Sequence, residues 1–273
     1  MIGHYDKHPH PRSSIFHPPS SIAPLRHLLV LLASAVACHA APADDAAWLT
    51  KEGTLIFHDA FEREEDGNLA KAIGNGWNSA TADRIPKIKQ ADLDGGVLKI
   101  ASASKEAGHA AHIHHEAGFR DGGVLVRFKF PGLTKGETMQ LGFVDRETTG
   151  IHAGHLCYAI LAGGKATLID HKTGVMDLKI RATRQDAAAR KTPVPPDLEK
   201  LLKTKQVTGD LKVDQEWHVL TLVTEGDEMR LSLDGRRVLS HRSAGFGHPM
   251  KRWFSFLVNS TLWVDDVKIY KVR

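Results

Sequence analysis

The stretch from residue 150 to 177, GIHAGHLCYAILAGGKATLIDHKTGVMD, concentrates side chains that can transfer protons. His152 and His155 precede an apolar run, and Asp170 and His171 follow it. Histidine titrates near neutral pH and serves as a general acid or base, and a neighbouring carboxylate can orient its ring. We therefore expect a catalytic site formed by these four residues.

Strand periodicity predicts which of these side chains can meet. In an extended strand His155 and Cys157 share one face, and the opposite face holds Leu156, Tyr158 and Ile160. The second set suits a protein core, so we expect His155 and Cys157 on the opposite, concave face of a sheet. A hairpin turn at the glycine pair 163–164 should then bring His171 close to His155, on the same side.

Two sets of side chains could hold a divalent metal ion. Imidazole and thiolate ligands suit Zn²⁺, and the candidates are His155, Cys157 and His171. Oxygen ligands suit Ca²⁺, and Asp59 and Asp265 lie on the first and last strands that the sequence predicts. The spacing matches no C-x-x-C or H-E-x-x-H motif. In the alternative, Cys157 is a small buried side chain, the histidines are polar edge residues and the aspartates form surface salt bridges.

Four further residues are candidates for binding a ligand. His112 and His114 lie in the segment HAAHIHHE, residues 109–116, and share one face of a predicted strand. We expect them either to contact a ligand or to form the polar side of an edge strand. Trp77, in the loop GNGWNS, stacks on a sugar ring or plugs one end of a β-sandwich. Lys172 follows His171 directly and completes this set.

The first 40 residues differ in character from the rest of the chain. A basic step at Arg26, an apolar run at 28–36 and small residues before Ala40 predict a secretory signal that is cleaved after residue 40. In the alternative, Cys38 is the lipidated residue of a lipoprotein. We expect a secreted or periplasmic protein in which residues 41–53 form a linker.

Composition and charge exclude several classes of protein. The chain has 273 residues, 42% of them hydrophobic and 25% charged, which is typical of a globular protein. Its net charge is +4, and residues 1–40 hold three basic and one acidic residue, so about +2 remains, too little to indicate a nucleic-acid partner. No segment is apolar over the length of a permanent membrane span. Without residues 1–40 only Cys157 remains, so we expect no intrachain disulfide. We also expect a monomer.

An alternation of period two dominates the chain from Thr54 onward. In GGVLVRFKF it places Val124, Val126 and Phe128 on one face, with Arg and Lys on the other. Glu-Gly-Asp and Asp-Gly turns separate the later strands. The pattern predicts an all-β, two-sheet antiparallel sandwich over 54–273. Residues 177–208 break it and predict a helical insertion, which is either a solvated excursion or a lid.

The motifs FHDAFERE, DGGVLKI, FRDGGVLVRFKF, WHVLTLVTEGDEMRLSLDGRRV and VDDVKIYKV together resemble the concanavalin A-like jelly roll. In particular, they resemble secreted bacterial domains related to the 3-keto-disaccharide hydrolases. The resemblance implies one curved, concave sheet and a carbohydrate or carbohydrate-derived ligand.

The chain departs from the known catalytic patterns of this fold. It lacks the Tyr-Glu-x-Gln motif of the keto-sugar hydrolases, and it lacks the Glu-x-Asp-x-x-Glu strand of the laminarinase-like glycosidases. Two hypotheses remain open. One is a hydrolase or lyase that acts on a 3-keto-glycoside or related saccharide, and the other is a non-catalytic glycan-binding module.

Overall fold

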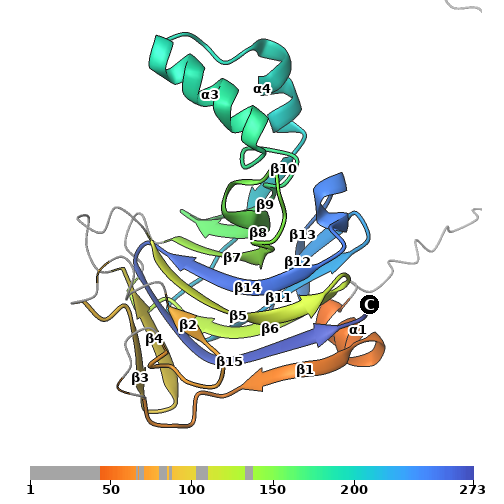
Figure 1. The fold of residues 1–273 in the computed structure, drawn as a ribbon. Helices are drawn as coiled ribbons and strands as arrows, with labels where there is room; N and C mark the ends of the chain where they lie inside the picture. Colours follow the sequence, from red (N-terminus) through yellow and green to blue (C-terminus); the bar gives the residue numbers. More distant parts are fainter. Residues whose placement is uncertain are drawn as a thin grey trace, which may run out of the picture. The chain divides into compact units, whose positions relative to one another are not determined.

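Two antiparallel β-sheets packed face to face form the body of the protein in the computed structural model (Figure 1). The structure describes residues 44–65, 67, 71–79, 85, 88–102, 110–132 and 138–273, which lie in one compact unit, Ala40–Arg273. The predicted signal segment at 1–40, with Cys38, lies outside the described residues. The predicted all-β sandwich is confirmed.

Each sheet joins strands that are distant in the sequence. The first sheet has the order β13 (Arg236–Arg242), β12 (Glu228–Leu233), β11 (His218–Glu225), β6 (Gly122–Lys129), β15 (Thr261–Lys271), β4 (Val97–Ala101) and β3 (Ala91–Asp94), and β1 (Thr54–Asp59) also pairs with β15. The second sheet has the order β10 (Gln206–Asp210), β9 (Lys165–Asp170), β8 (His155–Ala162), β7 (Thr138–Val144), β14 (Lys251–Val258), β5 (Ala111–Phe119) and β2 (Asn78–Ser79).

The hydrophobic core lies between the two sheets and is built from alternate strand residues. On β6 the fully buried side chains are those of Val124, Val126 and Phe128, as the alternation predicts. On β14 the core side chains are Phe254, Phe256 and Val258. Because side chains alternate along a strand, the outer face of the second sheet receives Trp253, Ser255 and Leu257. That outer face positions the candidate site.

A short helix occupies the segment that was expected to be a linker. Helix α1 (Asp45–Glu52) packs its buried Leu49 against Val223 and Tyr270 on the outer face of the first sheet. The carboxylate of Asp45, itself buried, accepts hydrogen bonds from Arg230, Arg237 and Ser232, at 2.9, 2.6 and 2.6 Å. The linker prediction is therefore wrong here, because an apolar residue and a paired charge attach this segment to the sheet.

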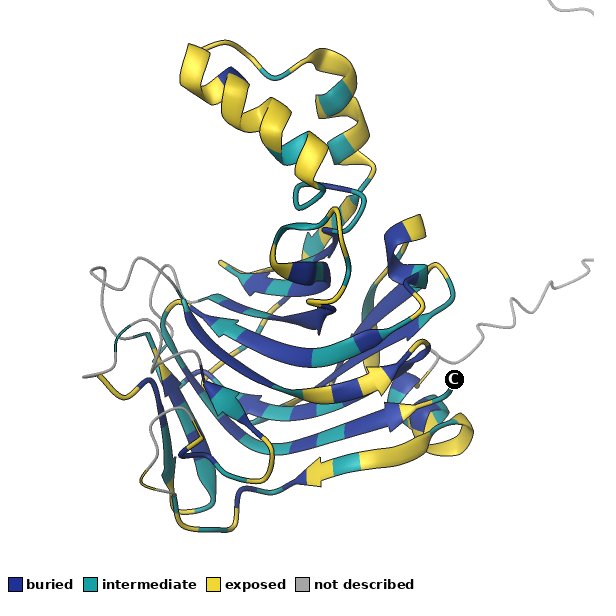
Figure 2. Ribbon diagram, in the orientation of Figure 1, coloured by how far each residue is buried: buried dark blue, intermediate teal, exposed yellow. Residues whose placement is uncertain are grey.

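Two helices form a hairpin within the predicted insertion. Helix α3 (Leu178–Arg190) begins at the capping residue Asp177, and α4 (Pro196–Lys203) follows, with Ala187 as the only residue of either helix that is classed as buried. Figure 2 shows the hairpin as mostly exposed. Two short 3₁₀ turns, η2 (His152–Gly154) and η3 (Ala244–Gly247), complete the elements. None of the helices in the described part of the chain has the length and apolar character needed to cross a membrane.

Candidate functional site

One row of register partners crosses the outer face of the second sheet. Asn78 of β2 pairs with His114 of β5, which pairs with Ser255 of β14. Ser255 pairs with Gly142 of β7, and Gly142 pairs with Tyr158 of β8. Because the core residues of these strands alternate with the row, its side chains share the outer face. The row offers imidazole, hydroxyl, amide and phenol groups to this face and no carboxylate.

Tyr158 ends this row, and its ring packs over Gly142. A Cβ atom at Gly142 would lie 2.7 Å from ring atoms of Tyr158, so the glycine provides the space that the ring fills. The Tyr158 hydroxyl lies 2.7 Å from Nδ1 of His155 and 3.3 Å from Oγ of Ser255. Tyr158 is buried whereas His155 is half-buried, so His155 is the member of this pair that is open to solvent. The phenol thus holds the orientation of a more accessible imidazole.

A β-bulge explains why Tyr158, rather than Cys157, accompanies His155. The register between β7 and β8 shifts at this point, since Val144 pairs with His155 but Phe143 pairs with Cys157. Leu156 is the additional residue, and both Leu156 and Cys157 face the core. The bulge reverses the predicted faces of Cys157 and Tyr158. Burial also raises the pKa of the Cys157 thiol to about 12, so it is a protonated core side chain.

The predicted zinc site is therefore wrong. Cys157 lies on the opposite side of the sheet from His155, and no group of three or more His, Cys, Asp or Glu in the described ranges is arranged to hold a metal ion. The two aspartates of the predicted calcium site are each bound to other side chains. Asp59 is buried and accepts bonds from Arg63 and Trp77, whereas Asp265 forms an ion pair with Arg127.

His155 and His171 do meet on the same side of the sheet. Their ring centroids are 6.4 Å apart, and the ring of His171 lies 5.1 Å from that of Tyr158. His171 is buried, its Nδ1 has no hydrogen-bond partner among the described residues, and burial lowers its pKa to about 4. His171 is therefore neutral at physiological pH. It serves as packing behind Tyr158 rather than as a proton donor.

Asp170 faces away from these histidines. It pairs with Cys157 in register and is completely buried on the core side. Its carboxylate accepts hydrogen bonds from the amides of Thr173 and Gly245, both at 2.9 Å, and from the hydroxyls of Thr173 and Ser243. Asp170 thus ties β9 to η3, and the expected role beside His171 does not fit this geometry.

His152 provides a second accessible imidazole. Its ring centroid lies 6.4 Å from that of His155, and both side chains are half-buried. Between them Ala153 has a φ of 51°, a left-handed conformation that costs a non-glycine residue free energy. Asp145 donates its amide to the Gly154 carbonyl at 2.9 Å and holds this turn in place. The fold thus maintains a strained turn that brings two solvent-accessible histidines together.

His112 and His114 lie on the same outer face, as predicted. Their ring centroids are 5.1 Å apart, and the His114 ring meets Trp253 edge-on at 5.2 Å. Burial, followed by the charge of Arg146, lowers the pKa of His114 to about 4. His114 is therefore a neutral hydrogen-bonding group next to Ser255.

Two of the predicted ligand contacts have other positions. Trp77 is buried in the core and donates its indole N–H to Asp59 at 2.8 Å, so it plugs the end of the sandwich. Lys172 is half-buried beside His171, and its amide donates to the Leu156 carbonyl at 2.9 Å. Sequence reasoning missed Tyr158, Ser255 and Gly142, because only the pairing of distant strands aligns them.

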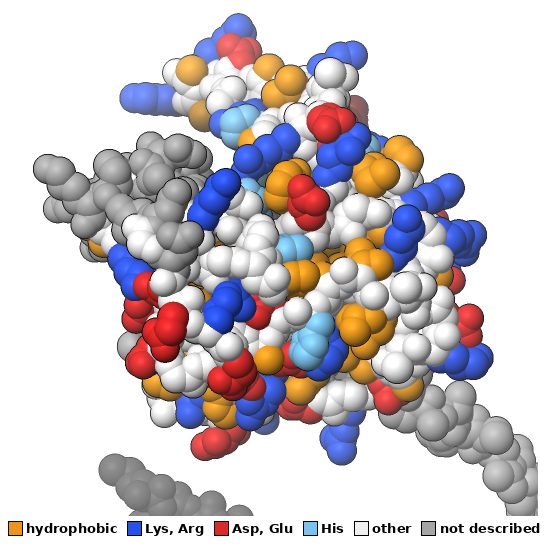
Figure 3. Space-filling view, turned by 60° about the horizontal axis from the view of Figure 1, so that its bottom comes forward, with side chains coloured by type: hydrophobic (Ala, Val, Ile, Leu, Met, Phe, Trp, Pro, Cys, Tyr) orange, Lys and Arg blue, Asp and Glu red, His pale blue; other side chains and the backbone are white. Residues whose placement is uncertain are grey.

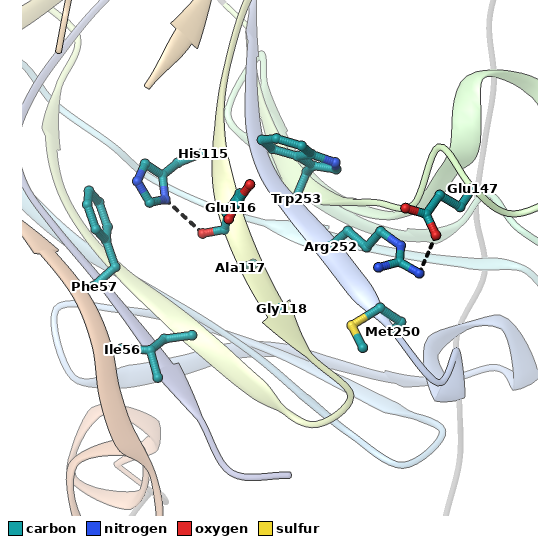
Figure 4. Close-up of a pocket in the computed structure, with 10 residues that line it drawn as sticks. All are labelled: Ile56, Phe57, His115, Glu116, Ala117, Gly118, Glu147, Met250, Arg252 and Trp253. Atoms are coloured by element: carbon teal, nitrogen blue, oxygen red, sulfur yellow. Dashed lines mark hydrogen bonds and ion pairs between the residues drawn. The ribbon is translucent and has the colours of Figure 1, made fainter. Parts of the chain in front are cut away.

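A cavity of about 520 Å³ opens beside the row (Figure 4). The small residues Ala117 and Gly118 lie on β5 at the cavity, and Phe57 and Trp253 contribute aromatic surface. A neighbouring cavity of about 510 Å³ shares His115, Glu116 and Trp253 with it. This size is typical of sites for small ligands. Trp253 links the cavities to the row, since its ring also meets that of His114.

No protein-family model matches the chain, and no curated protein matches it. Solved structures do share its fold. The laminarinase from Rhodothermus marinus is 15% identical, with a TM-score of 0.52, and the match covers 80% of this chain and 97% of that one. The laminarinase from Flavobacterium sp. UMI-01 is 14% identical, with a TM-score of 0.50 and coverage of 80% and 100%.

A mutant of SCLam, a non-specific endo-β-1,3(4)-glucanase from family GH16, is 13% identical, with a TM-score of 0.52 and coverage of 81% and 95%. That structure has 1,3-β-D-cellobiosyl-glucose at its active site. The chain has the same concanavalin A-like fold. Identities this low show the fold alone, so the chemistry has to be argued from the residues of this chain.

Proposed function

We propose that the protein is a carbohydrate-active enzyme that cleaves glycosidic bonds by β-elimination, with His155 and His152 as its proton-transfer pair. The observation that supports this most is the hydrogen bond of 2.7 Å between the buried Tyr158 hydroxyl and Nδ1 of the half-buried His155. With Nδ1 of His155 beside the Tyr158 hydroxyl, Nε2 is the nitrogen that we assign to proton transfer.

The residue types favour elimination over the double displacement of retaining glycosidases. Double displacement requires a pair of carboxyl groups flanking the bond. His155 and His152 supply imidazoles instead, which remove a proton efficiently near neutral pH. The carboxylates of Glu116 and Glu147 line the cavity beside Trp253. A saccharide suits this chemistry when a carbonyl acidifies the C–H bond next to it, as in a uronate or a 3-keto-glycoside.

The proposed reaction balances with two imidazoles. Nε2 of His155 takes the proton from the carbon next to the carbonyl, the electron pair forms a C=C bond, and the C–O bond to the leaving sugar breaks. Protonated His152 supplies a proton to the leaving oxygen. Both side chains are half-buried rather than enclosed, so exchange with solvent restores their protonation states.

Tyr158 and its neighbours position His155. Burial raises the pKa of the Tyr158 phenol, so it stays neutral. For Nε2 of His155 to be the base, its Nδ1–H donates to the phenol oxygen, and the phenol proton goes to Oγ of Ser255. Ser255 holds the other side of that hydroxyl at 3.3 Å. The chain Ser255–Tyr158–His155 therefore fixes the ring, as an orienting group does for other catalytic bases. Export through the signal expected at 1–40 would deliver such an enzyme to saccharides outside the cell.

The test incubates the protein with polyuronates, 3-keto-glycosides and neutral β-glucans, and analyses the products by mass spectrometry and ultraviolet absorbance. Elimination gives an unsaturated sugar that is lighter by one water than the hydrolysis product. We expect His155→Gln to lower kcat by about 10²–10⁴-fold, the range for loss of a general base. The matched control His218→Gln, on β11 of the other sheet, should leave kcat unchanged.

Each other outcome has a definite meaning. Saturated products that contain oxygen from solvent water would show that the enzyme hydrolyses the bond and does not eliminate across it. Binding of saccharides without turnover across the whole panel would favour a glycan-binding module. Full activity of His155→Gln would contradict the assignment of the base.

A further inference from the structure

The positive charge of the chain is concentrated in the helical hairpin. Residues 178–205 hold eight Lys and Arg against three Asp and Glu, a formal net charge of +5. The whole chain carries +4, so all the remaining residues together carry −1. Figure 3 shows Lys and Arg side chains on the hairpin at the top of the view. A field this localised acts on ligands near the hairpin rather than on the molecule as a whole.

Both ends of the hairpin are attached beside the histidine site. At its start, Asp177 bridges to Ile151, and the amide of His152 donates to the Met176 carbonyl at 2.8 Å. At its end, the Lys205 carbonyl accepts the amide of Asp170 at 2.8 Å. The hairpin therefore leaves the sheet next to His152 and returns next to His171.

The hairpin is not explained by packing. Helix α4 has no buried residue, and α3 buries only Ala187. Lys179, Arg184 and Lys203 are exposed, and none of them forms an ion pair with another residue of the described chain. Helices that stabilise a fold usually bury an apolar face against its core. These two helices instead present unpaired cations to solvent, so their contribution is not one of packing.

A further cation lies at the other side of the site. Arg146 lies two residues after the end of β7 and is exposed, and it forms no ion pair within the described ranges. Its charge acts on both His114 and Tyr158, which lie on either side of Ser255 in the row. Positive charge thus flanks the imidazole pair from Arg146 and from the hairpin.

We propose that the substrate is an anionic saccharide, a polyuronate, which the hairpin and Arg146 attract to the site through its carboxylates. This inference rests on the proposed function and names the class of substrate within it. The carboxylate of a uronate has two uses in one molecule. It is attracted by the cations, and its carbonyl acidifies the neighbouring C–H bond from which His155 takes a proton. A neutral glucan offers neither.

The test compares two triple variants of the full protein. The hairpin variant combines Lys179→Gln, Arg184→Gln and Lys203→Gln. The control combines Lys212→Gln, Arg236→Gln and Lys271→Gln, which are exposed, remove the same charge and lie outside the hairpin. The probes are polygalacturonate and alginate, with laminarin as the neutral saccharide and duplex DNA as a different polyanion. Binding is measured by titration and turnover by product formation, at low and high salt.

We expect the hairpin variant to bind polyuronate about tenfold more weakly than the control at low salt, because steering by a charged surface falls with its charge. Its kcat should be unchanged, and the difference should vanish near 0.5 M salt, where screening is nearly complete. An increase in KM without a fall in kcat separates attraction from folding damage, and equal melting temperatures of the two variants check this independently.

The outcomes separate this inference from the proposed function. Elimination from 3-keto-glycosides without binding of polyuronate overturns the inference and leaves the proposed function standing. Turnover of laminarin overturns both, because a neutral glucan has no acidified C–H bond. If polyuronate binds in a way that depends on the hairpin but is not turned over, the inference is supported and the proposed enzymatic function is refuted. Preference for DNA over polyuronate, or equal affinities of the two triple variants, overturns the inference.

Discussion

The ring of Tyr158 occupies the space above Gly142, its register partner on β7. Any side chain at position 142 would point to the same outer face and meet this ring. The glycine therefore lets Tyr158 lie flat across the sheet and place its hydroxyl between His155 and Ser255, at 2.7 and 3.3 Å. The geometry of the proposed base depends on a residue that has no side chain.

Gly142→Ala should displace Tyr158 and disturb His155. The new Cβ would lie 2.7 Å from the Tyr158 ring and 2.2 Å from the Cys157 carbonyl oxygen, so strands β7 and β8 must shift. We expect a loss of about 1–3 kcal/mol in the free energy of unfolding, the usual cost of overpacking. Activity should fall together with it. Gly67→Ala, whose Cβ meets nothing within 4 Å, is the control and should change neither quantity.

Tyr158→Phe tests the orienting role of the phenol separately from its packing. The ring remains and only the hydroxyl is lost, so we expect the melting temperature to change little. The rate kcat should fall about tenfold or more, since a catalytic group held out of line reacts poorly. The pH profile of kcat/KM should move as well, because His155 loses the partner of its Nδ1. A variant with an unaltered pH profile would show that Tyr158 only fills space.

Acid should destabilise the protein in two separate steps. The pKa of His171 is lowered from 6.5 to about 4, so below pH 6.5 the unfolded chain binds a proton that the folded protein does not. This contribution is intact above pH 6.5 and is lost as the pH falls toward 4, by an amount on the order of 3 kcal/mol. Asp45 and Asp59 have pKa values below 3.8, so their contribution is lost only at lower pH.

Denaturant titrations at a series of pH values check this sequence of events. His171→Gln has no imidazole to protonate, so its stability should fall less between pH 6.5 and 4, whatever its absolute value. Below that window the variant and the natural protein should fall in parallel. Parallel curves throughout would mean that His171 is not held neutral by burial.

Asp45→Ala should destabilise the protein by about 3 kcal/mol, because it removes the buried carboxylate that binds both Arg230 and Arg237 and leaves the buried Arg230 with only its more exposed partners Glu225 and Glu228. The neighbouring change Asp44→Ala removes only the cap of α1 and should cost about 1 kcal/mol. Chemical denaturation measures both, and turnover per folded molecule should be unchanged in both. Similar losses for the two variants would mean that α1 is not attached through Asp45.

The sequence alone determined the class of fold. Alternation of apolar and polar residues is local, so it predicted the buried face of β6 and the sandwich as a whole. Helix-forming composition with paired prolines likewise predicted the helices within 177–208. The proximity of His155 and His171 also followed from local features, a strand, a glycine turn and a second strand.

Only the tertiary structure decided which side chains form the site. One additional residue in β8, Leu156, opposes β7 and turns Cys157 into the core and Tyr158 outward. A strand has a period of two, so a single bulge reverses the faces of all residues beyond it, and its position depends on the partner strand. In the same way, Trp77 can be buried in the core because Asp59, 18 residues earlier in the chain, accepts a hydrogen bond from its indole N–H. Pairings between distant segments, which local pattern does not contain, placed Ser255 and Gly142 beside Tyr158.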